Sequence, residues 1–391
     1  MIILDHPYVS QILEDTILKN NYPVLKNKAS EELNLREDLP FLDDHAFAEA
    51  IKGKDFPLVY TNSENSIEWI SRNLDFTPLP ELISNFKDKV KFRRLIKAMY
   101  PNFFFREVSF DDLEKIFHGE LPYPFIIKPS VGFFSIGVHV VNDAAEWVKV
   151  VAKLKSEIDS LGRNFPGEVI NVSTFILEEI IPGDEFAVDV YYDRAGKPVV
   201  LNILKHLFSS AEDVSDRVYI TSKQIIEDHL ESFTRFLSKM GDLIELRGFP
   251  MHIEFRVDSK NNIVPIEVNP MRFAGWCVTD IAWYAFGINV YEYFFEQKQP
   301  DWKNILKDKN DDIFSMVVAD LPGDIPAEKI RKIDYLKFQN YFEEPLELRK
   351  IDYKKHGVFA FQFARTSYKN RKMLEDILKS DLKEFLIMKT R

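Results

Sequence analysis

The chain has 391 residues, of which 46% are hydrophobic and 29% are charged, so a packed globular protein of two or three domains is expected. Its net charge of −11 argues against nucleic acid or an anionic membrane as the main partner. The single cysteine, Cys277, excludes an intramolecular disulfide and in practice a cysteine-based zinc site, which fits the reducing cytoplasm.

The N-terminal residues predict a small parallel α/β unit. Strand-like runs at 1–4 and 56–60 are separated by a helical stretch from about Pro7 to Asn20, and this alternation favours a parallel sheet. A basic amphipathic helix is expected from Lys87 to Tyr100. No signal peptide precedes the first strand, and no apolar run approaches the roughly 18 residues of a membrane span, so a cytoplasmic protein without membrane contact is predicted.

The middle and C-terminal parts of the chain predict further strands and helices. Expected strands lie at 124–128, 137–141, 175–179, 185–192 and 199–208, and expected helices at 144–160, 225–240 and 279–295. After a polar boundary at 297–301, strands at 314–319 and 358–364 and a closing helix at 371–388 predict a small α+β module. No chemistry is assigned to this module.

The loop from Lys128 to Gly137 is a candidate phosphate-binding loop. It joins two strand-like runs and contains Ser130, Gly132 and Ser135. Glycines let backbone N–H groups approach a ligand closely, and successive N–H groups form an anion-binding concavity. The lysine adds a point charge that suits phosphate. The alternative is an ordinary hairpin with a long turn, since the loop is neither a P-loop nor a dinucleotide fingerprint.

The segment from Leu177 to Phe186 is a candidate nucleotide-binding segment. Apolar residues lead into a Pro-Gly turn, and carboxylates stand on both sides of it. Backbone groups of such a segment could contact the edge of a purine, and Glu185 could bond to ribose hydroxyls. The alternative is an ordinary acidic turn with solvated carboxylates.

The segment from His252 to Gly275 predicts an antiparallel hairpin. Apolar and polar residues alternate in two short runs, and the polar residues between them have turn chemistry. If the strands pair regularly with Val257 facing Val264, then His252 lies opposite Asn269.

In this register Glu254 also lies directly opposite Glu267. Like charges in that position destabilise a sheet unless something positive lies between them. A divalent cation with oxygen ligands, Mg²⁺ or Mn²⁺, would be suitable. A register shifted by two residues would instead place Arg256 opposite Glu267 as an ordinary ion pair. The hairpin alone leaves both arrangements open.

The lysine loop, the acidic segment and the hairpin, in this order, resemble the ATP-grasp superfamily and in particular its carboxylate–amine ligases. The resemblance covers about Lys89 to Phe295, and its strongest part is His252-Ile-Glu-Phe with Ile266-Glu-Val-Asn-Pro-Met-Arg. It implies a multidomain α/β and α+β protein with an ATP-grasp fold. The expected parts are an N-terminal pre-ATP-grasp domain at 1–88, an ATP-grasp domain at 89–298 with a lid subdomain at about 110–182, and a C-terminal α+β module at 299–391.

The resemblance also implies a role for each candidate residue. Lys128 and Arg272 would be the catalytic residues, with Arg272 orienting the acyl substrate or stabilising the transferring group. The ligands of Mg²⁺ or Mn²⁺ would be Glu254, Glu267 and Asn269. ATP phosphates would contact Lys128, the loop residues Ser130, Gly132, Ser135 and Gly137, and one basic residue before the lid, either Lys91, Arg93 or Arg94. Adenine would contact Glu178 and the backbone of Glu179 to Ile181, ribose would contact Glu185, and Lys205 would be a further phosphate contact or an ordinary surface lysine.

The activity that the resemblance implies is ATP-dependent, ADP-forming ligation of a small carboxylate to an amine through an acylphosphate. One alternative is an ATP-grasp enzyme that modifies a protein C-terminus or a carboxylated cofactor. The other is a non-catalytic nucleotide-binding regulator. ATP and Mg²⁺ are the expected cofactors, nucleic acid and membrane are not expected partners, and the apolar stretch 283–295 is expected to form core or a homodimer interface.

Overall fold

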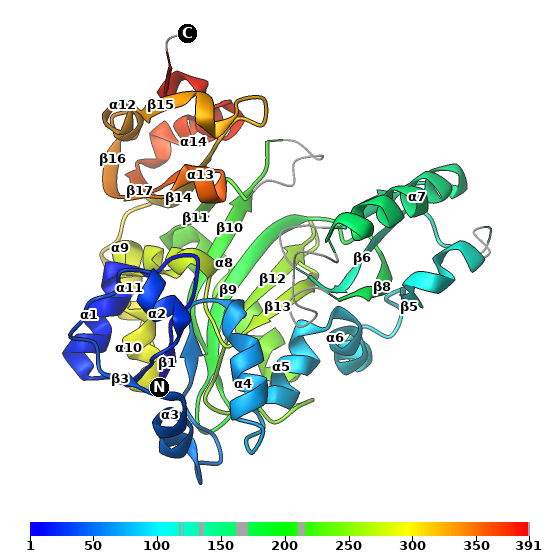
Figure 1. The fold of residues 1–391 in the computed structure, drawn as a ribbon, viewed down its shortest axis with the longest axis horizontal. Coiled ribbons are helices and arrows are strands. Elements are labelled where there is room, and N and C mark those ends of the chain that lie inside the picture. The colour runs from blue at the N-terminus through cyan, green and yellow to red at the C-terminus, as the bar shows by residue number, and fades with distance from the viewer. Residues whose placement is uncertain (117–118, 120, 133–136, 162–170, 210–215, 390–391) are drawn as a thin grey trace. The chain divides into compact units, whose positions relative to one another are not determined.

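The computed structural model describes residues 1–116, 119, 121–132, 137–161, 171–209 and 216–389 (Figure 1). Contacts within the chain divide it into two compact units, which are described separately. The first unit comprises Met1–Gly183, Tyr192–Lys197 and Leu237–Cys277, and the second comprises Asp184–Tyr191, Pro198–Phe236 and Val278–Arg391. The three domains expected from the sequence stay a prediction.

The first unit opens with the parallel sheet that the sequence predicts. Its strand order is β3-β2-β1-β4, and Ile2 pairs in parallel with Val24 and Tyr60. The strand expected at 56–60 begins only at Tyr60, after Pro57, which has no N–H to donate to a ladder. The strands are β1 (Ile2–Ile3), β2 (Val24–Leu25), β3 (Phe41–Leu42) and β4 (Tyr60–Thr61). The helices are α1 (Gln11–Asn20), α2 (Lys28–Glu32), α3 (Asp44–Ile51), α4 (Ile67–Asn73) and α5 (Leu79–Lys87).

The basic helix expected from Lys87 to Tyr100 is present in a shorter form, as α6 (Lys89–Leu95) and a 3₁₀ turn. Helix α5 ends at Lys87, and α6 begins after Asp88. The Asp88 carboxylate accepts the N–H groups of Val90 and Lys91, so it caps α6 and makes Lys89 its first residue. A 3₁₀ turn at Ile96–Ala98 follows.

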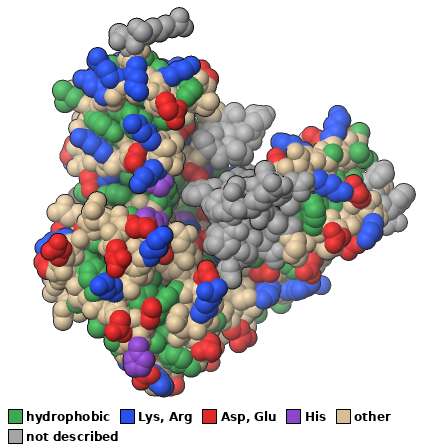
Figure 2. Space-filling model, viewed as in Figure 1, with side chains coloured by type: hydrophobic (Ala, Val, Ile, Leu, Met, Phe, Trp, Pro, Cys, Tyr) green, Lys and Arg blue, Asp and Glu red, His purple; other side chains and the backbone are tan. Residues whose placement is uncertain are grey.

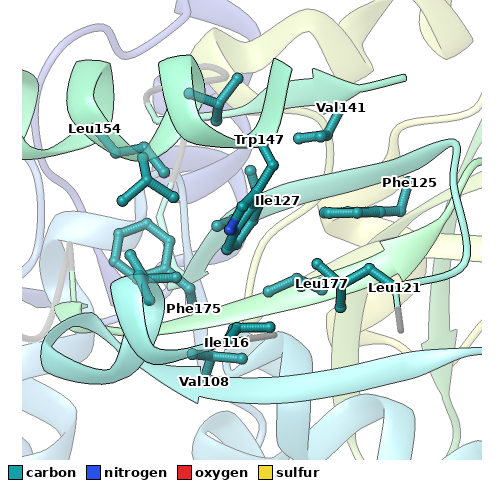
Figure 3. Packing of buried hydrophobic residues seen from close by; sticks show 13 residues of the cluster. Val108, Ile116, Leu121, Phe125, Ile127, Val141, Trp147, Leu154, Phe175 and Leu177 are labelled. Carbon is teal, nitrogen blue, oxygen red and sulfur yellow. The ribbon is translucent and has the colours of Figure 1, made fainter. Parts of the chain in front are cut away.

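A four-stranded antiparallel sheet covered by one long helix occupies the part of the first unit that was expected to form the lid, and we call it the lid sheet. Its strand order is β5-β8-β6-β7. Side chains from the sheet and from α7, among them Phe125, Ile127, Trp147, Phe175 and Leu177, form one buried hydrophobic cluster (Figure 3). The elements are β5 (Phe105–Ser109), β6 (Phe125–Val131), β7 (His139–Val141), β8 (Asn171–Glu179) and α7 (Ala144–Leu161).

The face of this sheet opposite the hydrophobic cluster carries two charged residues. Because successive side chains point to opposite faces, Lys128 on β6 and Glu178 on β8 lie on the face away from the hydrophobic cluster. Lys128 pairs with Ile176, two residues from Glu178 in the same antiparallel ladder. The core pattern of the lid therefore places these two charged residues side by side.

The predicted hairpin is present in the first unit as β12 (Phe249–Val257) and β13 (Ile263–Pro270). Glu254 pairs with Glu267 and His252 with Asn269, which is the first of the two expected registers. The alternative ion pair with Glu267 is not formed, since Arg256 donates to the Gly183 carbonyl at 3.0 Å.

The hairpin departs from regular pairing just beyond Glu254. Phe255 pairs with Pro265, so Ile266 is an extra residue and β13 has a bulge. Val257 consequently faces Ile263, one residue away from the expected partner. Pro265 has no N–H for a ladder bond, and bulges are among the few places where a sheet accepts proline.

The second unit is built on six strands in the order β9-β10-β11-β14-β17-β16, with a separate ribbon of β15 and β18. Its strands are β9 (Asp184–Tyr192), β10 (Pro198–Leu207), β11 (Val218–Thr221), β14 (Ile313–Asp320), β15 (Ile330–Ile333), β16 (Glu344–Lys350), β17 (Val358–Thr366) and β18 (Leu386–Met388). Its helices include α8 (Lys223–Gly241), α9 (Ile281–Phe286), α10 (Val290–Phe295), α11 (Trp302–Lys307), α12 (Tyr335–Gln339), α13 (Tyr353–His356) and α14 (Lys372–Lys379).

Two long helices that the sequence predicts in this unit are not present as single helices, so these predictions are wrong. The apolar stretch at 279–295 is divided into α9 and α10, because Gly287 adopts a left-handed conformation with φ 71° and ends α9. The closing helix ends at Lys379, and Leu386–Met388 instead pairs with β15 as strand β18. An amphipathic pattern carries no signal for such a break.

The surface and the helices give two further observations. On the face drawn in Figure 2, acidic side chains are interspersed with basic ones, so the acidic excess is not gathered in one patch there. Within the described part of the chain, no helix combines the length and the apolar character needed to cross a membrane.

Candidate active site

A buried ion-pair chain joins the lid sheet to helix α6. Glu178 on β8 is 2% exposed. One of its carboxylate oxygens contacts Lys128 Nζ, and the other accepts a hydrogen bond of 2.8 Å from Arg93 Nε. Burial alone would raise the pKa of Glu178, but Lys128 and Arg93 outweigh it and lower the pKa to about 2. The carboxylate is therefore ionised and holds the Lys128 ammonium in place.

The positive charge at and around Lys128 is greater than the single carboxylate of Glu178 balances. Burial lowers its pKa, Glu178 opposes that effect, and the neighbouring cations Lys89 and Arg93 lower the pKa further. A buried ammonium among other cations favours the approach of a polyanion such as a phosphate chain. The phosphate contact expected of Lys128 stays a prediction.

The three expected metal ligands lie together on the hairpin. Glu254 faces Glu267 across the ladder, and Asn269 Nδ2 is 3.5 Å from Glu254 Oε1. The positive group beside them is Lys89, whose Nζ lies 2.8 Å from Glu267 Oε2. Burial would raise the pKa of Glu267, but Lys89 and then Lys87 lower it to about 2. Both facing carboxylates stay partly accessible, with side chains 28% and 22% exposed.

This donor set fits Mg²⁺. Two carboxylates and one amide oxygen are hard ligands, and Mg²⁺ commonly takes only one or two carboxylates because it keeps waters and substrate phosphates. Among the residues that the structure describes, no group of three or more His, Cys, Asp and Glu side chains is arranged to hold a metal. A metal here would therefore need further ligands from a phosphate or from water.

A second charged group lies at the end of the hairpin. Arg272 donates to Phe273 O at 2.9 Å through Nη1, and its Nη2 lies 3.1 Å from Glu64 Oε1. The other oxygen of Glu64 contacts Lys87 Nζ. Burial would raise the pKa of Glu64, but Lys87 and Arg272 lower it. Two cations share one carboxylate, so the group retains a net positive charge that suits an anionic substrate.

The lid loop is described only in part. Ser130 is fully buried, and within the described residues its hydroxyl has no hydrogen-bond partner. Gly132 O lies 3.5 Å from Lys89 Nζ, which brings the start of the loop beside the hairpin carboxylates. Gly137 has φ +69°, a conformation that favours glycine. Ser135, also expected to bind phosphate, lies outside the described residues.

The structure separates the basic candidates of the segment before the lid. Lys91 is exposed and donates to Ser84, and Arg94 is exposed and pairs with Glu107. Arg93 is buried against Glu178. The basic residue that reaches the hairpin carboxylates is Lys89, which sequence reasoning missed. The signal that could have found it is Asp88, whose helix-capping chemistry fixes where α6 begins.

Glu64 and Lys87 were also missed by sequence reasoning. Glu64 opens a 3₁₀ turn just after β4, where the carboxyl end of a parallel strand places polar residues at the edge of the sheet. Lys87 ends α5 and is 7% exposed. A lysine at the end of an amphipathic helix looks like any solvated one, so its burial could not be predicted.

The expected adenine segment follows β8. Glu178 itself is enclosed between Lys128 and Arg93, so its side chain is occupied. The Glu179 N–H donates to Phe104 O at 3.1 Å, whereas Ile181 is half-buried in an irregular, otherwise exposed stretch after the strand. Gly183 ends this stretch with φ +113°, and a Cβ there would lie 2.2 Å from Val257 O. Only glycine fits this close approach to the hairpin.

Two candidates belong to the second unit. Glu185 is half-buried, and its Oε1 lies 2.9 Å from His206 Nδ1. Lys205 Nζ lies 2.6 Å from Asp184 Oδ2 and 5.5 Å from the centre of the Phe186 ring. Their expected contacts with ribose and phosphate stay predictions, and the alternative that Lys205 is an ordinary surface lysine stays open.

Comparisons with known proteins give a domain match and a fold. Residues 121–280 match the model of the ATP-grasp domain. A search of curated proteins found no match. An L-amino acid ligase from Bacillus licheniformis is similar in structure, with a TM-score of 0.68 and 18% identity over 100% of this chain and 98% of that chain.

Two further structures are similar. A biotin carboxylase from Campylobacter jejuni, solved as a β-γ-ATP complex, has a TM-score of 0.63 and 13% identity over 99% of this chain and 92% of that chain. An N5-carboxyaminoimidazole synthase from Aspergillus clavatus, solved with ADP, has a TM-score of 0.60 and 12% identity over 97% and 98% of the two chains. At these identities the likeness shows the fold, and the expected ATP-grasp fold is confirmed.

Proposed function

We propose that this member of the ATP-grasp superfamily, identified by its domain match and its fold, is an ATP-dependent carboxylate–amine ligase. The observation that carries the proposal is the arrangement of Lys89 and Lys128 beside the facing pair Glu254 and Glu267. Cations suited to phosphates lie next to carboxylates suited to a metal. Similarity to an L-amino acid ligase supports a small carboxylate and an amine as the substrates.

Each charged group has a task in such a reaction. Lys128 and Lys89 would hold the phosphates and neutralise their charge, and Glu254, Glu267 and Asn269 would hold Mg²⁺. Bound there, Mg²⁺ would neutralise charge on the phosphates and stabilise the transferring group. Arg272, fixed by Glu64, would orient the substrate carboxylate. Positioning and charge neutralisation supply most of the catalysis in phosphoryl transfer.

The chemistry would proceed in two displacements. A carboxylate oxygen of the substrate attacks the γ-phosphorus of ATP, so that ADP leaves and an acylphosphate forms. The amine nitrogen then attacks the acyl carbon, phosphate leaves, and the nitrogen loses a proton to give the amide. No protein nucleophile takes part. The acylphosphate separates activation of the carboxylate from bond formation to the amine.

ADP release with paired small carboxylates and amines tests the proposal. Release should require Mg²⁺ and both substrates, and hydroxylamine added in place of the amine should trap the acyl group as a hydroxamate. The Lys128→Met variant should lower the rate by about 100-fold, because it removes a charge that acts on the transferring phosphoryl group. ADP release without a carboxylate, or no hydroxamate with any acid, would contradict the ligase. Turnover only with polypeptides as the carboxylate substrate would favour the alternative, an enzyme that modifies a protein C-terminus.

Several sequence predictions stay predictions beside this proposal. They are the cytoplasmic location, the homodimer, the lack of nucleic acid and membrane partners, and the boundaries of the three domains. The roles of Lys91 and Glu179 also stay untested, although Lys89 is better placed than Lys91 for a phosphate contact.

A further inference from the structure

Arg93 connects two parts of the first unit that come from distant segments of the chain. Its side chain is 2% exposed and lies on α6. Nε donates to Glu178 on β8 at 2.8 Å, and Nη1 donates to the Pro265 carbonyl on β13 at 2.7 Å. The guanidinium carbon lies 4.4 Å from the centre of the Phe103 ring. One planar group thus bonds to the lid sheet and to the hairpin.

The first bond acts on Lys128 through Glu178. The Glu178 carboxylate has one oxygen for Arg93 and one for Lys128. Strand alternation sets the face of the sheet on which Lys128 lies, but it leaves the long lysine side chain free to rotate. By fixing the carboxylate, Arg93 fixes the direction from which the Lys128 ammonium is held.

The second bond acts on Glu267 through the bulge. Pro265 is the residue where the hairpin pairing shifts, and Ile266 is the extra residue between it and Glu267. A bulge changes the aim of the side chains beside it, and bulges commonly adjoin functional sites. The bond from Arg93 to the Pro265 carbonyl anchors the bulge next to the pair of facing glutamates.

We propose that Arg93 is a positioning residue that sets both halves of the Mg-ATP site, the Lys128 ammonium through Glu178 and the Glu267 carboxylate through the bulge at Pro265. The inference rests on the proposed function for its account of the site. Arg93 itself touches neither phosphate nor metal in this account. Groups that orient metal and phosphate ligands in this way typically contribute about 10- to 100-fold in affinity or activity.

Two variants separate the two bonds. Arg93→Gln removes the charge beside Glu178 and should weaken binding of a non-hydrolysable ATP analogue with Mg²⁺ by about 10- to 100-fold. Arg93→Lys keeps a cation beside Glu178 but has no second donor in a fixed fork. It should retain most nucleotide affinity while raising the Mg²⁺ concentration for half-maximal binding by about tenfold.

Arg106→Gln is the matched control. It makes the same exchange at an exposed position of β5, opposite Leu177 in the same sheet. Calorimetric titration of the three variants and the unaltered chain gives nucleotide affinity and Mg²⁺ dependence, and thermal unfolding shows whether each is folded. In turnover, the KM for ATP should rise in Arg93→Gln while the KM for the carboxylate stays constant, a split that general loss of structure would not produce.

The outcomes are distinct. Folded Arg93 variants with the affinity and Mg²⁺ dependence of Arg106→Gln would overturn the inference. If Arg93→Gln does not fold, the Mg²⁺ concentration for half-maximal binding to Arg93→Lys tests the inference, and an unchanged value would overturn it. Binding of the analogue without turnover on any substrate pair would count against the ligase function, whereas the effect of Arg93 on binding would still be measured.

Discussion

Two buried ion-pair clusters, one in each unit, use similar residues in different ways. In the second unit Arg349 Nη2 lies 2.7 Å from Asp280 Oδ2 and 2.8 Å from Glu347 Oε2. Tyr291 OH donates to the other Asp280 oxygen, and the side chains of Arg349 and Asp280 are 1% and 0% exposed. We call this the Asp280 cluster. Both oxygens of the buried Asp280 carboxylate are bonded within the protein, so the pair of Asp280 and Arg349 is closed.

The cluster of the first unit is open by comparison. Glu267 and Glu254 face each other with partly exposed side chains, and a lysine ammonium is the cation beside them. An ammonium can move away when a phosphate arrives, whereas the guanidinium of Arg349 is buried, bonds to two carboxylates and lies over the Phe363 ring. Burial together with complete bonding therefore indicates a structural ion pair, whereas solvent access with exchangeable partners indicates a ligand-binding site.

The largest expected effect tests the open cluster. Glu267→Gln removes one of two carboxylates of the Mg²⁺ site, so Mg-ATP-dependent ADP release should fall by about 100-fold or more. Stability should change much less than activity, because the side chain is partly solvated. ADP release and urea unfolding measure the two effects. Unchanged turnover would show that the facing glutamates do not hold the metal.

The next effect tests the closed cluster. Asp280→Ala leaves the Arg349 guanidinium buried with an incomplete set of acceptors, and it should lower the free energy of unfolding by about 3–5 kcal/mol. Affinity for Mg-ATP should be retained in the folded protein. In the double variant Asp280→Ala with Arg349→Met the loss should be smaller than the sum of the single losses, because no unpaired charge remains. Additive losses would mean that the two residues do not act as a pair.

A smaller effect concerns the stability of the fold at acidic pH. Glu178 and Glu267 have pKa values of about 2 in the folded protein against an ordinary 4.5. Between these values the unfolded chain binds more protons, so both groups stabilise the fold above pH 4.5 and lose that contribution as the pH falls towards 2. Urea unfolding across this range should show the decline. The decline should be shallower in Glu178→Gln, and equal slopes in both proteins would contradict the depressed pKa.

Sequence alone predicts the elements whose pattern is local. The alternation in β12 and β13 predicts the hairpin, and the repulsion of facing glutamates points to the register that places Glu254 opposite Glu267. The bulge at Pro265 could not be predicted, since a period of two has no mark for an extra residue. The breaks at Gly287 and after Lys379 escape for a similar reason, because an apolar stripe continues through a turn.

The basic residues of the site show a different limit. Five cations lie within Lys87 to Arg94, and composition does not say which of them face inward. The choice between Lys89 and Lys91 depends on the residue at which α6 begins, and Asp88 sets that residue. Glu64 comes from a turn far away in sequence, and only the folded chain brings it to Arg272. Site residues were predictable where a motif fixes them and unpredictable where tertiary contacts do.

The tyrosine and arginine bonds to β13 also bear on aggregation. Strand β13 ends its sheet, and exposed strand edges can pair with another chain. Here Tyr100 OH donates to the Ile263 carbonyl and Arg93 to the Pro265 carbonyl, while proline offers no N–H. Two side chains thus occupy acceptors that an incoming strand would need. The contacts that order the site also keep this edge from acting as a template for intermolecular β-pairing.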